Sequence, residues 1–72
     1  MTREEAVNVA RQLAEQNRWT WTEPVRAVRS RRWWFGPAYW RVTSNATARG
    51  RNVIVTIDDA SRKVMQAKFA PR

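Results

Sequence analysis

The fold is decided by residues 52–63, which read NVIVTIDDASRK. Val53, Val55 and Ile57 occupy every second position, and this period of two predicts a strand with one buried face. The acidic and hydroxyl residues that follow favour a tight turn, because their side chains bond to nearby backbone N–H groups. A strand that enters such a turn returns beside itself, so we predict an antiparallel hairpin completed by residues 64–69.

Two further strands are predicted upstream of this hairpin. The dipeptide Gly36-Pro37 indicates a turn, and β-favouring residues stand on both sides of it. The alternation in the first of these segments slips near Val28, which predicts a bulge. Short connections favour antiparallel neighbours, so we expect a three- to four-stranded meander. The predicted strands span residues 25–34, 39–44, 52–58 and 64–69.

An amphipathic helix is predicted over residues 2–17. Thr2 and Glu5 have the spacing of a capping box, in which a hydroxyl and a carboxylate satisfy backbone N–H groups of the first turn. A narrow apolar stripe follows at helical spacing, with Leu13 as its expected anchor in the core. The fold class is therefore α+β, with one N-terminal helix packed on a three- to four-stranded antiparallel meander sheet in a single domain, residues 1–72. The stripe consists of Ala6, Val9, Ala10, Leu13 and Ala14.

The composition offers little material for catalysis. The chain contains neither histidine nor cysteine, which removes the commonest general base and all thiolate metal ligands. Asp58 and Asp59 suggest a shared site, but a role in the turn explains them better, since no other acid is placed to complete an oxygen shell. We therefore expect no enzymatic activity, no bound metal and no cofactor.

Positive charge is concentrated in the middle of the chain. The formal net charge is +8, and no acidic residue lies between Pro24 and Ile57. Arginine and tryptophan are the residue types most enriched at binding hot spots. Trp33 and Trp34 are adjacent in a predicted strand, so they must point to opposite faces, and we expect one of them to lie outside among arginines. The candidate partner-binding residues are Arg26, Arg29, Arg31, Arg32, Trp34, Arg41, Arg49 and Arg51.

This cationic segment has three explanations. It is a solvated face that maintains solubility, a nucleic-acid site in which a tryptophan stacks on unpaired bases, or a protein site that meets a carboxylate-rich surface. The sequence contains no recognised nucleic-acid-binding motif. We therefore favour an inhibitor or regulator that binds an acidic protein, with non-specific single-stranded nucleic-acid binding as the alternative.

The second half of the chain carries a family resemblance. Tyr39-Trp40-Arg41-Val42, a loop reaching Gly50 and the segment from Val53 to Val64 resemble the closing hairpin of PepSY-type domains and of small bacterial immunity proteins described as NTF2-like. Ser61-Arg62 stands where those families usually have Thr-Gly. The resemblance covers about half of the chain and implies a non-catalytic protein-binding or inhibitory module. It supplies no individual site residue.

The sequence also gives expectations for where the protein is located and whether it forms a dimer. The chain opens with charged residues rather than the apolar stretch of a secretory signal, and its longest apolar cluster, residues 33–35, is far shorter than a membrane span. We expect a cytoplasmic protein, bacterial or phage-encoded, that has neither a membrane nor a small molecule as its ligand. An exposed edge strand also offers a way to pair two copies into a dimer.

Overall fold

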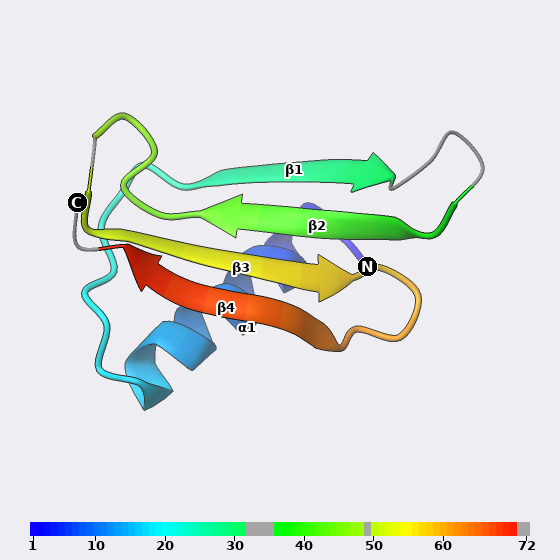
Figure 1. Cartoon of the computed structure of the whole chain (residues 1–72), viewed down its shortest axis with the longest axis horizontal. Helices are drawn as coiled ribbons and strands as arrows, with labels where there is room; N and C mark the ends of the chain where they lie inside the picture. Colours follow the sequence, from blue (N-terminus) through cyan, green and yellow to red (C-terminus); the bar gives the residue numbers. More distant parts are fainter. Residues whose placement is uncertain (32–35, 49, 71–72) are drawn as a thin grey trace.

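The computed structural model describes residues 1–31, 36–48 and 50–70 of the chain. Within these residues a single helix, α1 (Arg3–Gln16), lies across one side of a four-stranded antiparallel sheet, as Figure 1 shows. The strands follow one another in space in the order of the chain, which confirms the predicted α+β meander. They are β1 (Arg26–Arg31), β2 (Ala38–Thr43), β3 (Asn52–Asp58) and β4 (Val64–Ala70).

The ends of α1 are set by local hydrogen bonds. Thr2 Oγ1 accepts from the Glu5 amide at 3.2 Å and the Glu5 carboxylate accepts from the Thr2 amide at 2.9 Å, so the predicted capping box is confirmed. At the other end the amides of Arg18 and Trp19 donate to carbonyls of the last helical turn, at 3.1 and 2.8 Å. This Schellman geometry places Arg18 in the left-handed region, with φ of 57°.

Small side chains join the helix to the sheet. Ala6, Ala10 and Ala14 are fully buried, so the backbone of α1 can approach the strands closely. Leu13, the expected anchor, is only partly buried, because the alanines occupy the line that points directly at the sheet. The helix contacts β1, β2 and β3. The sheet contributes Val42, Val53, Val55 and Ile57 to the core, all fully buried.

The first strand is regular, so the predicted bulge near Val28 is wrong. Pairing between β1 and β2 runs without a shift from Arg26 opposite Thr43 to Arg31 opposite Ala38. Val28 is an apolar side chain that points away from α1 and is 45% exposed, which interrupts the apolar pattern without disturbing the backbone. The irregularity lies instead between β3 and β4, at residues 56–57.

The strand bounds otherwise agree with the predicted ones to within about a residue, except at the end of β1. Residues 32–35 of the predicted first strand lie outside the described part of the chain. No helix among the described residues is long and apolar enough to cross a bilayer.

The two sides of the sheet differ in what covers them. The covered face lies against α1 and is formed by Ala27, Trp40, Val42, Val53, Val55, Ile57, Ala67 and Phe69. Figure 1 looks onto the opposite side, with α1 behind the sheet. We call this side the open face, and it is formed by Arg26, Val28, Ser30, Tyr39, Arg41, Thr43, Ile54, Thr56, Met65, Gln66 and Lys68.

Candidate binding face

The strand register arranges the side chains of the open face in rows. Arg26 lies opposite Thr43 and Lys68 lies opposite Ile54, and these two pairs form one row across all four strands. Arg41 stands in the next row, on β2, between Val28 and Thr56. Neighbouring strands lie about 4.8 Å apart, so Arg26 and Lys68 are separated by about 14 Å across the sheet. The three cations therefore form a triangle, with Arg26 and Lys68 at the two edges of one row and Arg41 in the adjacent row.

Apolar side chains share the open face with these cations: Ile54 lies in the row of Arg26 and Lys68, Val28 lies in the row of Arg41, and Tyr39 lies one row further on. Val28 is 45% exposed and Met65 is 56% exposed, while Tyr39 and Ile54 are partly exposed. Two broad hollows of about 660 and 480 Å³ lie on this face. Both are lined by Tyr39, Arg41 and Ile54, so they adjoin along the centre of the sheet.

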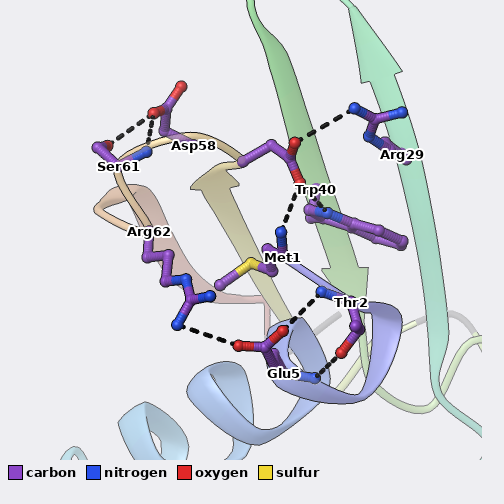
Figure 2. Close-up of polar contacts among 9 residues, drawn as sticks. Met1, Thr2, Glu5, Arg29, Trp40, Asp58, Ser61 and Arg62 are labelled. Carbon is purple, nitrogen blue, oxygen red and sulfur yellow. Dashed lines mark hydrogen bonds and ion pairs between the residues drawn. The ribbon is translucent and has the colours of Figure 1, made fainter.

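The cations of the open face have no acidic partner in the described part of the chain. The ion pairs found there involve Asp59, Glu5 and the groups that contact them, and none includes Arg26, Arg41 or Lys68. The acid nearest to the face is Asp58, opposite Tyr39 at the end of β3. Its carboxylate is bonded to its own turn, where it accepts from the amide and the hydroxyl of Ser61 at 2.8 and 2.6 Å (Figure 2). These hydrogen bonds lower the pKa of Asp58, so its carboxylate stays ionised and bonded within the turn.

A second polar cluster, centred on Asp59, links β1, β2 and the N-terminus to the turn after β3. The Asp59 carboxylate accepts from the Trp40 indole at 2.8 Å and from the Arg29 guanidinium at 3.2 Å, and it lies 3.4 Å from the Met1 ammonium. The hydrogen bond from Trp40, followed by that from Arg29, lowers the pKa of Asp59. Figure 2 shows dashed lines from Arg29 on β1, from Trp40 on β2 and from Met1 to one unlabelled carboxylate, which these contacts identify as that of Asp59. Arg29 is therefore part of the structure that joins β1 to the β3–β4 turn.

The structure distributes the predicted binding residues over several places. Arg26 and Arg41 share the open face, whereas Arg29 and Arg31 have the opposite parity in β1 and point to the other side. Arg51 is exposed in the loop before β3, with φ of 54°. The remaining predicted residues, Arg32, Trp34 and Arg49, lie outside the described residues.

Sequence reasoning missed part of the open face. Lys68 was not predicted, although it alternates with Ala67 and Phe69, which pack against the core. The alternation in β4 therefore contained the necessary information. The aliphatic residues of the face were missed because an isolated Val28 or Met65 resembles any core residue until the register is known.

The described tryptophans lie away from the open face. Trp19, Trp21 and Trp40 are partly buried against the core, and the ring of Trp19 stacks on Phe69 with centroids 6.2 Å apart. Tyr39 is therefore the one aromatic side chain on the open face within the described ranges. In the same ranges no three acidic side chains converge as a metal site would require.

Comparison of the chain with family models, with curated proteins and with solved structures gave no match.

Proposed function

We propose that this chain is a non-enzymatic binding module that docks its open face on an acidic protein and thereby inhibits or regulates it. The observation that carries the proposal is that Arg26, Arg41 and Lys68, unpaired among the described residues, share the open face with exposed aliphatic side chains. Protein interfaces likewise combine apolar side chains with polar and charged ones. Carboxylates on the partner would satisfy the cations and accelerate association by electrostatic steering.

Single-stranded nucleic acid is the second candidate and has weaker support. Sequence-independent binding of single strands relies on aromatic side chains that stack on successive bases. Among the described residues, the open face offers Tyr39 for that purpose, while Trp19, Trp21 and Trp40 pack on the covered side. A face of valine, isoleucine and methionine suits the apolar part of a protein surface better than it suits bases.

A matched pair of charge variants tests the proposal. The open-face variant carries Arg26→Gln, Arg41→Gln and Lys68→Gln, and a helix variant carries the same number of exchanges at Arg3, Arg11 and Arg18. Each variant and the wild type are immobilised, and proteins from a nuclease-treated lysate are quantified by mass spectrometry. We expect an acidic protein to be retained by wild type and helix variant, and to bind the open-face variant at least about tenfold more weakly.

Two outcomes would contradict this function. Equal losses in both variants would mean that net charge, and not this face, retains the protein. Tight binding of a labelled single-stranded oligonucleotide, with a steep salt dependence that only the open-face variant loses, would favour the nucleic-acid alternative.

A further inference from the structure

The free edge of β1 continues the open face. Among the residues that the structure describes, β1 is terminal in the strand order and pairs with β2 alone, so one side of its backbone has no neighbouring strand there (Figure 1). Arg26 and Val28 belong both to the open face and to this edge strand. A segment that lies alongside β1 would therefore extend the same surface.

Hydrogen bonds between β2 and β3 identify which groups of β1 point outward. The Ser44 amide donates to the Val53 carbonyl and the Asp59 amide donates to the Ala38 carbonyl, each at 3.0 Å. Even-numbered residues of β2 therefore bond to β3, and the alternation of antiparallel ladders turns the odd-numbered residues of β2 toward β1.

The register carries this alternation into β1. The odd-numbered residues of β2 lie opposite Arg26, Val28 and Ser30, so these three residues bond to β2. Their neighbours Ala27, Arg29 and Arg31 direct their amides and carbonyls outward, to the free edge. The carbonyl of Val25, which has the same parity, accepts from the Arg3 guanidinium at 3.3 Å, as expected for an outward group.

Charge determines what this edge can accept. The β1 sequence RAVRSR contains three arginines and no acid. Two copies of β1 would repel one another, since like charges on paired strands are destabilising. Arg29 is already paired with Asp59, so an acidic strand would meet Arg26 on one of its faces and Arg31 on the other. The other edge, β4 (Val64–Ala70), has Lys68 as its one cation and so lacks this selectivity.

We propose that an acidic, extended segment of the partner adds to β1 as a fifth strand. The outward amides and carbonyls of Ala27, Arg29 and Arg31 pair with its backbone, which is the recognition mode of β-augmentation. Side chains alternate along a strand, so every second side chain of the segment lies on the open face beside the row that begins at Val28. The others lie on the opposite side, where Arg31 points. This inference rests on the proposed function and adds that the partner is extended where it binds β1.

Amide hydrogen exchange tests the edge directly. The probe is a peptide of about eight residues in which pairs of glutamates alternate with pairs of valines, so that glutamates lie on both faces of the strand, and the control replaces each glutamate by lysine. In the free chain the Ala27, Arg29 and Arg31 amides should exchange rapidly, while those of Val28 and Ser30 are already protected. Saturating acidic peptide should slow exchange of the three outward amides at least about tenfold, and the lysine peptide should not. Unchanged exchange at these amides, or slowing confined to β4, would overturn the proposal.

A proline variant separates the edge from the open face. Ala27→Pro removes one outward N–H without changing charge and without removing a bond to β2, which edge strands tolerate. We expect it to weaken peptide binding at least about tenfold, since the ring also blocks the approach of a fifth strand, while Ala27→Ser binds as wild type does. Circular dichroism checks that both variants fold, and the exchange measurement on wild type does not depend on either of them.

The two proposals fail in different ways. Normal peptide binding by Ala27→Pro, together with loss of the captured acidic protein by the open-face variant, would overturn the edge proposal alone. Retention of that protein by the open-face variant would overturn the proposed function, whatever the peptide does.

Discussion

The two faces of the sheet are made by alternate residues of the same strands, but they differ in composition and in ion pairing. On the covered face the side chains are mostly apolar, and the buried hydroxyl of Ser44 is bonded to the Val53 amide at 2.8 Å. On the open face Arg26, Arg41 and Lys68 have no ion pair within the described residues. We therefore expect stability to depend on the covered face and the proposed binding to depend on the open face.

The largest contrast should come from two isoleucines of β3. Ile57 is fully buried on the covered face and Ile54 is partly exposed on the open face. We expect Ile57→Ala to lower the free energy of unfolding by about 2–5 kcal/mol, because it leaves a cavity in the core. Ile54→Ala should cost less than about 1 kcal/mol, since a partly exposed side chain loses little burial. Urea denaturation measures both, and equal losses would show that the open face is part of the core.

The buried hydroxyl of Ser44 gives the next largest expected effect. Ser44→Ala leaves the Val53 amide buried without its acceptor, at a cost of about 1–3 kcal/mol. Thr43→Ala, one residue earlier and on the open face, is the matched control and should change stability by less than about 0.5 kcal/mol. Thermal unfolding of the two variants side by side tests the difference. A Ser44→Ala chain as stable as wild type would mean that the Val53 amide finds another partner.

Acid should destabilise the chain through the Asp59 cluster. The pKa of Asp59 is lowered from its ordinary value of 3.8, so the folded state favours the carboxylate more than the unfolded state does. This contribution is complete above that value and is lost as pH falls through the lower folded pKa. Asp58 and Glu5, whose ordinary values are 3.8 and 4.5, shift in the same direction and add to the loss.

The variant Asp59→Asn isolates the Asp59 contribution. Its unfolding midpoint should be lower than that of wild type at neutral pH and should approach it as pH falls below 3.8 and through the lower folded pKa of Asp59. Unfolding followed by tryptophan fluorescence across this pH range measures the difference. A constant difference at every pH would show that the charge of Asp59 contributes nothing.

A smaller change, in the opposite direction, is expected at the end of α1. Arg18 has φ of 57° in the position that glycine usually occupies after a helix. Arg18→Gly should raise stability by up to about 1 kcal/mol, because glycine adopts this conformation without a steric penalty. Arg11→Gly in the middle of the helix should lower it by a similar amount. Denaturant titration of the pair checks the opposite signs.

The smallest effect on stability should come from the open-face cations. The combined exchange of Arg26, Arg41 and Lys68 to glutamine should change the free energy of unfolding by no more than about 0.5 kcal/mol, since exposed charges contribute little to folding. Urea denaturation of the same protein used for binding makes the comparison. Unfolding of this variant would mean that the cations are structural and that its binding defect is indirect.

Local rules predicted most of the fold from the sequence. The capping box of Thr2 and Glu5 and the alternation of β3 are encoded by neighbouring residues, so they needed no tertiary information. The bulge near Val28 was wrongly predicted because the binary pattern assumed that every apolar side chain of β1 points to the core. That assumption fails where an apolar residue belongs to a surface.

The candidate site was less predictable, because its composition depends on parity and on distant contacts. The arginines of β1 were grouped by their proximity in sequence, whereas the strand divides Arg26 from Arg29 and Arg31. Neighbouring residues gave no indication that Asp59 would bond to Trp40, 19 positions away, and to Arg29. Applying the alternation to the cations as well as to the tryptophans would have placed Lys68 on the same face as Arg41.

A map of amide chemical shifts on titration with the captured acidic protein tests the central claim most directly. If that protein docks on the uncovered side of the sheet, the shifts should concentrate at Arg26, Val28, Arg41 and Lys68. Residues on the outer surface of α1, such as Arg11, should remain unchanged. Shifts centred on the outer surface of α1, with the sheet residues unaffected, would contradict the account.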